Sequence, residues 1–216
     1  CKQHAVLTTI DFSKAFDCIN FSHLLSALAS HGFSEHSVEW FSSYLHGRHQ
    51  RTKYYNTISS ALPISTGVPQ GSILGPVLFN IFIDTLLQTL PPDSTVAYAD
   101  DVTLISHSDT VASATCAMQL LLQSVYDWSV SNGMSISVAK CFAMHIAPTI
   151  RNNQPSQLIL QLGHEVLPTV TSLRILGVTL SHDLSWNMHF DKVRKKVSSM
   201  TGTIFRFGRT LNADCR

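Results

Sequence analysis

The chain is poor in charge and has no long uninterrupted apolar run. Only 13% of its 216 residues are charged, whereas 44% are hydrophobic, and no short repeat is present. This composition excludes intrinsically disordered and fibrous classes and can fill a sizeable core. The longest strongly apolar window, Ile73–Ile83, is interrupted by Gly75, Pro76 and Asn80. It is too short to span a bilayer and no signal sequence opens the chain, so we expect no membrane contact.

Paired cysteines and metal-binding motifs are also missing. The five cysteines are odd in number and include no C-x-x-C pair. This argues against a disulfide framework and for a reducing, intracellular compartment. The spacing of His46 and His49 is the closest to that of a zinc site, but no cysteine accompanies them, so we read them as surface histidines.

The net charge of +1 hides an uneven distribution. Residues 186–216 contain seven Lys and Arg against two Asp, a net charge of +5, while the rest contains eight against twelve, a net charge of −4. A basic segment on a slightly acidic body is typical of contact with a polyanion, although a solvated helix face would look the same.

Hydrophobic periodicity predicts a mixture of helices and strands. The predicted helices are Ser22–His31, a second beginning after Ser34 and ending near Gly47, Val77–Leu90, Val111–Ser131 and Asn187–Phe205. The predicted strands are Ala5–Ile10, Arg51–Ile58 and Ala61–Thr66 joined at Ser59-Ser60, Thr95–Ala99, Val102–Ser106, Cys141–Ile146, Leu158–Leu162, Glu165–Leu167 and Leu173–Leu180, with a polar loop at 147–156. This order predicts an α+β fold with a largely antiparallel sheet backed by helices 77–90 and 111–131.

Three carboxylates stand where strands end. Asp11 follows the first predicted strand, and Asp100-Asp101 form the predicted tip of a hairpin. Two adjacent carboxylates resist joint ionisation unless a cation compensates them. Hard oxygen ligands of this kind suit Mg²⁺ or Mn²⁺. An isolated Asp-Asp is also common in turns, so this pair alone would carry little weight.

Five segments in order resemble motifs A to E of reverse transcriptases of non-LTR retrotransposons, of the jockey and LINE type. They are IDFSKAFD (10–17), GVPQGSILGPVLFNIFI (67–83), YADD (98–101), SVAK (137–140) and ILGVTL (175–180). The linking stretches HLLSAL, SYLHGRHQ and LSWNMHFDKVRKKV resemble the same family. The resemblance implies a polymerase palm with part of the fingers and the start of the thumb.

The resemblance also implies a set of catalytic and nucleotide-binding residues. Asp11, Asp100 and Asp101, with the Phe12 carbonyl, would hold two Mg²⁺ or Mn²⁺ ions, with Asp101 contributing less. Lys140 would protonate the leaving pyrophosphate, or else be a solvated surface lysine. The resemblance places Phe16 as a gate against the 2′-hydroxyl, with core packing as the alternative. It places Gln70, Gly71 and Tyr98 around the incoming nucleotide; the alternative for the Gln70-Gly71 loop is that its glycines serve only the loop geometry.

Nucleic-acid contacts are implied at three further places. By the resemblance, Leu176 and Gly177 would form the turn that sets the primer 3′ end; the alternative is an ordinary glycine within a strand. The other expected contacts with phosphates are basic residues of two segments. Arg48, Arg51 and Lys53 could equally be ordinary hairpin surface, and the remaining four are Lys192, Arg194, Lys195 and Lys196.

The expected function is RNA-templated, two-metal addition of deoxynucleotides to a primer 3′ end, in the service of retrotransposition. The expected partners are an RNA template, a DNA primer, deoxynucleoside triphosphates, and fingers, thumb and endonuclease segments beyond this chain, in a nuclear or cytoplasmic ribonucleoprotein. We expect a reverse transcriptase domain over 1–185 and the start of the thumb over 186–216. The alternatives are an inactive relic that binds nucleic acid, or a maturase or telomerase on the same palm. Without its upstream fingers, the chain is expected to polymerise poorly.

Overall fold

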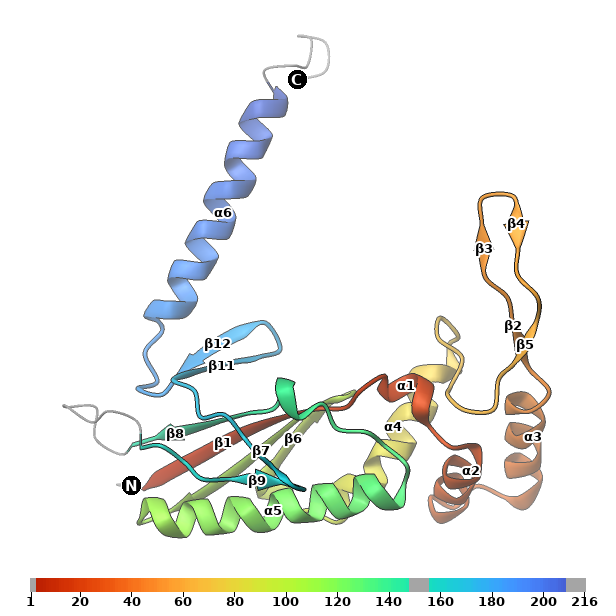
Figure 1. The fold of residues 1–216 in the computed structure, drawn as a ribbon, viewed down its shortest axis with the longest axis horizontal. Coiled ribbons are helices and arrows are strands. Elements are labelled where there is room, and N and C mark those ends of the chain that lie inside the picture. The colour runs from red at the N-terminus through yellow and green to blue at the C-terminus, as the bar shows by residue number, and fades with distance from the viewer. Residues whose placement is uncertain (1–2, 148–155, 209–216) are drawn as a thin grey trace.

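A four-stranded antiparallel sheet forms the centre of the molecule. In the computed structural model, which describes residues 3–147 and 156–208, its strand order is β6-β7-β1-β8. The strands are β1 (His4–Asp11), β6 (Thr95–Tyr98), β7 (Asp101–Ser108) and β8 (Phe142–Ile146). Figure 1 shows the two central strands, β1 and β7, running along the middle of the body. The first strand of the chain therefore lies beside the hairpin strand that carries the second acidic motif.

The two faces of β1 serve different layers, because side chains alternate along a strand. Val6 and Ile10 face the main core, which contains the apolar residues of helices α4 (Leu74–Leu87) and α5 (Val111–Ser131). Leu7 faces the opposite way, into a smaller cluster with Met144 and Leu173. The predicted sheet backed by these two helices is confirmed. The face opposite α5 also holds Asp11, which is four residues on from Leu7.

Further helices extend the body beyond one end of the sheet. They are the short α1 (Ala15–Cys18), α2 (Phe21–Ser30) and α3 (Glu35–Leu45). The Asn20 side chain accepts a hydrogen bond from the Ser22 backbone at the start of α2, and Ser34 accepts one from Ser37 at the start of α3. None of the helices in the described part of the chain is long and apolar enough to cross a membrane.

A hairpin projects from the end of α3. Its pairs are β2 (His49–Gln50) with β5 (Leu62–Pro63), and β3 (Lys53–Tyr54) with β4 (Thr57–Ile58). The predicted turn at Ser59-Ser60 is wrong, because the chain reverses at Tyr55-Asn56. Ser59 instead lies in the returning arm, where its backbone N–H donates to the Thr52 carbonyl and its hydroxyl accepts from the Thr52 backbone.

The remaining strands form two small hairpins. One is β9 (Gln161–Leu162) with β10 (Glu165–Val166), which turns at Gly163-His164 as predicted. The other is β11 (Ser172–Ile175) with β12 (Val178–Ser181), where a single strand was predicted. Leu176 and Gly177, with φ of 47° and 87°, form a two-residue turn there. The polar loop predicted at 147–156 lies almost wholly outside the described residues.

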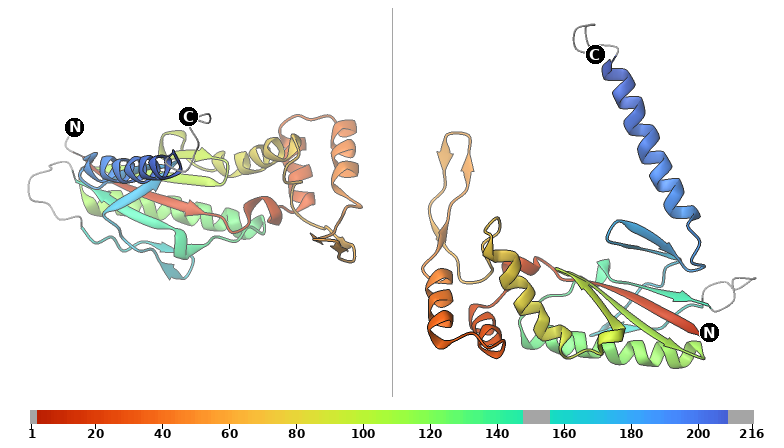
Figure 2. Two further views of the ribbon diagram at one scale, coloured as in Figure 1. Left: turned by 90° about the horizontal axis from the view of Figure 1, so that it is seen from above. Right: turned by 180° about the vertical axis from the view of Figure 1, so that it is seen from behind.

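The last helix, α6 (Asn187–Gly208), leaves the body after β12. Figure 1 shows α6 and the β3–β4 hairpin standing on the same side of the body, opposite α5, and Figure 2 shows this arrangement from behind. Two short 3₁₀ turns, η1 (Pro92–Ser94) and η2 (Val138–Lys140), precede β6 and β8. The fold thus consists of a body and two projecting arms, which are the hairpin of residues 49–63 and helix α6 (Figure 1). The predicted domain boundary at 185/186 stays a prediction.

Candidate active site

Asp11 and Asp101 are direct partners across the sheet. The register between β1 and β7 pairs them at the end of the ladder, after Ile10 with Val102. Cross-strand partners in an antiparallel pair point to the same face. Both carboxylates therefore lie on the face opposite α5, at the edge where β1 ends and β7 begins.

The hairpin between β6 and β7 reverses one residue earlier than predicted. Tyr98 pairs with Asp101, so the turn consists of Ala99 and Asp100. Ala99 has φ of 52°, the left-handed region that non-glycine residues rarely occupy. Asp101 was expected to contribute less to the metal site, but this one-residue shift puts it in the strand, opposite Asp11 and on the same face. Asp100 lies in the turn beside them, and Tyr98 shares the face of Asp101.

Lys140 lies next to Asp11. Its Nζ is 3.3 Å from Asp11 Oδ1, and 67% of the lysine side chain and 35% of the aspartate side chain are exposed. The turn η2 is held in place by backbone bonds, since the Ser137 N–H donates to the Asp11 carbonyl and the Ser13 N–H donates to the Ser135 carbonyl. The segment predicted to carry a catalytic lysine is therefore joined to the end of β1.

A buried thiol supports Asp11 from behind. The Asp11 backbone N–H donates to Cys141 Sγ over 3.4 Å, and the Cys141 S–H donates to the Ser137 carbonyl over 3.3 Å. Burial raises the pKa of the Cys141 thiol, so it remains protonated and neutral beside the carboxylate. Phe12, the next residue, is buried edge-on against Trp128, which fixes the direction of the chain at this point.

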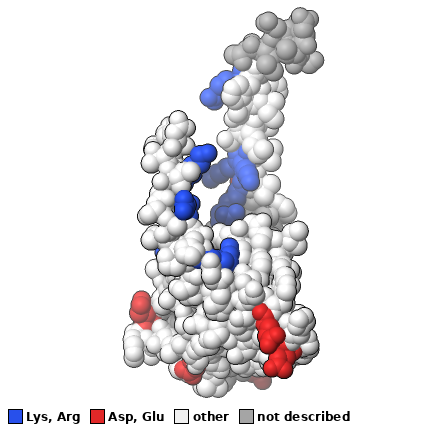
Figure 3. All heavy atoms as spheres, turned by 90° about the vertical axis from the view of Figure 1, so that its right-hand side faces the viewer, with Lys and Arg blue, Asp and Glu red and all other residues white. Residues whose placement is uncertain are grey.

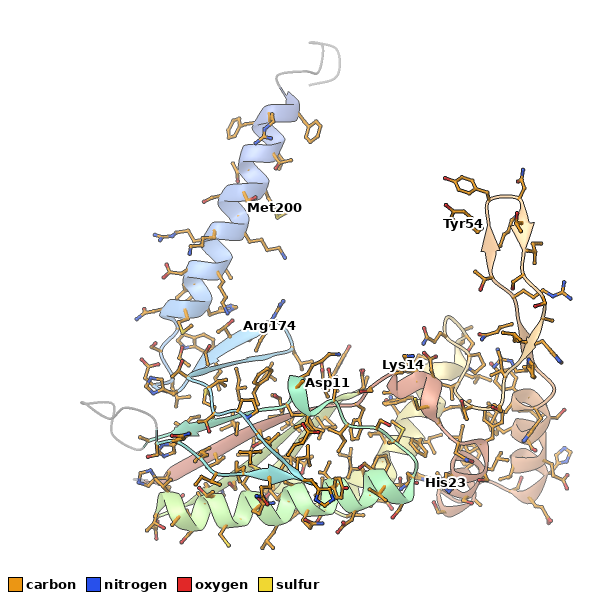
Figure 4. All side chains as sticks on the ribbon, in the orientation of Figure 1. Asp11, Lys14, His23, Tyr54, Arg174 and Met200 are labelled. Atoms are coloured by element: carbon orange, nitrogen blue, oxygen red, sulfur yellow. The ribbon has the colours of Figure 1, made fainter. Side chains whose placement is uncertain are left out.

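A cleft of about 440 Å³ opens over the two carboxylates. Asp11, Asp101, Tyr98 and Lys140 line it from the sheet, and the β11–β12 hairpin lines it from the other side. The hairpin contributes Leu176 at its turn, together with Arg174. Lys192 of α6 also lines the cleft and donates from Nζ to Thr179 Oγ1 over 3.2 Å. Figure 4 shows Asp11 near the middle of the body and Arg174 on the hairpin beyond it.

Arg174 was missed by sequence reasoning. It directly precedes the segment that resembles motif E, and that position was the available signal. Together with Lys140 and Lys192 it gives the cleft three cations against two carboxylates. A phosphate-bearing substrate suits a site of this composition, because the carboxylates bind cations and the cations bind phosphates.

A second cleft, of about 650 Å³, lies beside the motif B loop. It is lined by Gln70, Arg48, Asp17 and Lys14, among others. Gln70 Nε2 donates to Asp17 Oδ1 over 2.7 Å, and in the described part of the chain neither Arg48 nor Lys14 has an ion-pair partner. Lys14, with φ of 50°, was not predicted, although it lies inside the motif A segment. The predicted nucleotide contact Gln70 is thus oriented by motif A.

The motif B loop packs tightly on α1. The Gly67 N–H donates to the Ile19 carbonyl and the Val68 N–H donates to the Phe16 carbonyl. A Cβ at Gly67, where φ is 86°, would come within 2.8 Å of Asp17 Cα. At Gly71, where φ is 81°, an added Cβ would meet no atom within 4 Å, so within the protein only the turn requires glycine. The predicted place of Gly71 beside the incoming nucleotide stays a prediction.

Phe16 packs against Phe79 in this structure. Their rings stack with centroids 4.2 Å apart, and Phe16 is half-buried. Phe16 lines neither of the two clefts, so its contacts in the structure are those of a residue that packs in the core. Its role as a gate against the 2′-hydroxyl stays a prediction.

The other predicted basic residues lie on the two arms. Arg51 and Lys53 are exposed on the projecting hairpin, whereas Arg48 is half-buried at its base. On α6, Lys195 and Lys196 are exposed, and Arg194 pairs with Asp191 over 3.3 Å. Figure 3 shows Lys and Arg gathered on the hairpin and along α6, with Asp and Glu lower on the body.

The carboxylates fit a divalent cation that also binds substrate. Within residues 3–147 and 156–208, no three His, Cys, Asp or Glu side chains cluster as a complete metal cage. Mg²⁺ is usually bound by one or two carboxylates together with substrate phosphates and water, rather than by a cage of protein ligands. Asp11 and Asp101 supply such a partial set, and phosphates would complete it.

An antiparallel sheet on two helices, with carboxylates at adjoining strand ends, agrees with the polymerase palm that the resemblance implies. Residues 1–180 match the family described as "Reverse transcriptase (RNA-dependent DNA polymerase)", and the chain belongs to this family. The chain is similar to solved telomerases from Candida tropicalis and Candida albicans. For each the identity is 12% and 84% of this chain is covered, with 35% and 31% of the solved chains covered and TM-scores of 0.56 and 0.55. This likeness shows the fold alone.

The curated relatives are proteins of retrotransposable elements. A "putative 115 kDa protein in type-1 retrotransposable element R1DM" of Drosophila melanogaster is 32% identical over 98% of this chain. The "RNA-directed DNA polymerase from mobile element jockey" of the same species is 28% identical over 94%. The chain covers 20% and 23% of these two relatives, about a fifth of their length. These findings confirm the resemblance to reverse transcriptases of non-LTR retrotransposons.

Proposed function

We propose that the chain carries the nucleotidyl-transfer site of an RNA-directed DNA polymerase that copies a retrotransposon RNA. The observation that carries the proposal is the pairing of Asp11 with Asp101 in the sheet, on the face of the cleft that also holds Lys140, Arg174 and Lys192. The relatives named RNA-directed DNA polymerase support the reaction class.

Asp11 and Asp101 would bind Mg²⁺ or Mn²⁺ together with the substrate phosphates, and Asp100 in the adjoining turn would add its charge. The bound ions would lower the pKa of the primer 3′-hydroxyl and neutralise charge on the leaving oxygen. The Phe12 carbonyl stays a proposed ligand from the resemblance. The chain's own contribution is to hold two carboxylates at fixed positions, one at the end and one at the start of a paired strand.

The cations around the cleft would position the substrates. Arg174 and Lys192, with the turn at Leu176-Gly177, would hold phosphates of the primer end. Lys140 would hold its ammonium proton beside Asp11 for the leaving pyrophosphate. Gln70, oriented by Asp17, would lie beside the incoming deoxynucleotide or its template base. Positioning of this kind supplies most of the catalysis in phosphoryl transfer.

The test is addition of one deoxynucleotide to a DNA primer on an RNA template. It should be run with Mg²⁺ or Mn²⁺ on this chain, and on a chimaera in which the chain replaces the matching segment of the R1 relative. We expect the chimaera to extend the primer and Arg174→Gln to raise the KM for the primer–template more than it lowers kcat. An unchanged KM would remove Arg174 from the proposed site.

A further inference from the structure

The tip of the projecting hairpin carries two exposed tyrosines that the fold does not use. Tyr54 is 74% exposed and Tyr55 is 82% exposed, and their rings meet edge to face with centroids 4.7 Å apart. Every residue from 49 to 63 is exposed, so the hairpin packs on no other element. These aromatic side chains therefore contribute nothing to a core.

Tyr55 also occupies a backbone conformation that disfavours it. Its φ is 49°, at the first position of the two-residue turn between β3 and β4. Glycine is the residue that such a turn prefers, and a bulky side chain there costs stability. An exposed ring kept at this cost points to a role other than stability.

The charge around the tyrosines indicates what they contact. Residues 40–83 contain no Asp or Glu, and their only Lys and Arg are Arg48 at the base of the hairpin and Arg51 and Lys53 on it. Within the described residues none of the three forms an ion pair. The hairpin thus carries basic side chains, no acidic ones, and aromatic rings at its tip. These groups suit a single nucleic-acid strand, because the basic side chains can bind its anionic phosphates and the rings can stack on its flat bases.

The position of the hairpin tip suggests that the bound nucleic-acid strand is one that leads into the clefts. The hairpin rises beside the cleft that holds Gln70 and Arg48, and Tyr54 projects from it on the side on which α6 stands (Figure 4). Figure 3 shows the basic residues of the hairpin and of α6 on the two arms of the molecule. A strand lying between the arms would pass the tyrosines before its bases reach Gln70.

We propose that Tyr54 and Tyr55 stack on unpaired bases of the template strand ahead of the active site, with Arg51 and Lys53 on the adjoining phosphates. The ligand is single-stranded nucleic acid, RNA in the proposed reaction. The proposal rests on the proposed function for the identity of that strand. Its test needs neither metal nor nucleotide transfer, so the two can fail separately.

The test is equilibrium binding in EDTA of a fluorescent RNA hairpin with a ten-nucleotide single-stranded 5′ overhang, compared with the same hairpin without it. The double variant Tyr54→Leu/Tyr55→Leu should weaken binding of the overhang probe by roughly 5–150-fold for each base that is no longer stacked. It should leave binding of the blunt probe, and the slope of log K against log salt, unchanged. Arg51→Gln/Lys53→Gln should lower that slope by roughly 0.7 for each phosphate that the variant no longer neutralises.

Two further variants separate stacking from folding. Tyr55→Gly should weaken overhang binding without lowering the free energy of unfolding, because glycine relieves the strained φ. The control is Trp40→Leu, which removes an exposed aromatic side chain of α3 outside the hairpin. This variant should bind the overhang like the parent chain.

Equal overhang affinity in the tyrosine variants would overturn the proposal. So would a change of sedimentation coefficient in those variants without a change in RNA affinity, because the tip would then be a contact between protein molecules.

Discussion

At the scale of single residues, the structure adds to the YADD motif the position of Asp101, which faces Asp11. The YADD segment alone places two carboxylates at a turn, but the ladder register decides which of them faces Asp11. A shift of one residue moves a strand side chain to the other face. That register depends on pairing between segments about 90 residues apart, which no local pattern contains.

We predict that Asp101→Asn lowers Mg²⁺ affinity as much as Asp11→Asn does. Each substitution removes one negative charge from the same face of the sheet. Isothermal titration with MgCl₂ on the two variants and on Asp100→Asn is the measurement, with Asp93→Asn, an exposed aspartate in η1, as the control. Asp101→Asn with parental affinity would show that the register does not set the metal ligands.

Lys140→Ala should raise the affinity for Mg²⁺. The ammonium of Lys140 competes for Asp11 Oδ1 in the free chain, and its removal leaves the carboxylate unpaired. Both groups are partly exposed, so the gain should be modest, up to about fivefold. Lys53→Ala, a lysine on the hairpin, serves as the comparison. Weaker Mg²⁺ binding in Lys140→Ala would mean that the lysine supports the carboxylate rather than competing for it.

At the scale of elements, local chemistry predicted the long helices and the buried strands well. Ser34 and the apolar spacing of residues 111–131 were sufficient, because a cap and a 3.6-residue period act within one element. The hairpins were harder to predict. Their turns depend on left-handed residues such as Tyr55 and Leu176, which are not the glycine or asparagine that marks a turn in sequence.

The tight contact between the motif B loop and α1 gives a prediction on stability. Gly67→Ala should lower the free energy of unfolding more than Gly71→Ala does, by roughly 1–3 kcal/mol. Both residues have positive φ, but only at Gly67 would the new methyl group meet the backbone of Asp17. Urea unfolding of the two variants isolates this steric part. Equal losses of stability would show that the loop can move away from α1.

The link between α2 and α4 gives a prediction on pH. His31 Nδ1 lies 2.7 Å from the Ala27 carbonyl oxygen, and Nε2 lies 2.9 Å from Asp84 Oδ2. Two acceptors require both ring nitrogens to be protonated, so the hydrogen bond to Ala27, and then that to Asp84, raise the pKa of His31.

The folded chain binds this proton more tightly than the unfolded chain does. The contribution of protonated His31 to the free energy of unfolding is therefore complete below a pH of about 6.5, and it is lost as the pH rises through the higher pKa of the folded chain. His31→Ala should remove this part of the pH dependence, less than about 1 kcal/mol for a partly exposed pair. His36→Ala, an exposed histidine of α3, should keep it. Urea titrations between pH 5.5 and pH 8.5 would measure the difference, and identical curves for His31→Ala and the parent chain would contradict it.

At the scale of the whole molecule, basic and acidic residues are separated between the two projecting elements, α6 and the β3–β4 hairpin, and the body (Figure 3). The basic residues of α6 and the hairpin stand away from the body, which carries most of the acidic residues (Figure 3). The sequence predicted the basic C-terminal segment and the order of the motifs. The two clefts follow from the packing of β11–β12 over β1, and of the motif B loop over α1, which arises only once the chain is folded.

The most direct test of the proposed site is incorporation of a single deoxynucleotide by the chimaera with the R1 relative, with and without Asp11→Asn and Asp101→Asn. Both carboxylates lie in the proposed site, so each substitution is expected to reduce the rate by roughly 10²–10³-fold, with the affinity for primer–template changed little. Loss of incorporation in both variants supports the site on β1 and β7. Incorporation by either variant at the parental rate, or none by the parental chimaera, would contradict it.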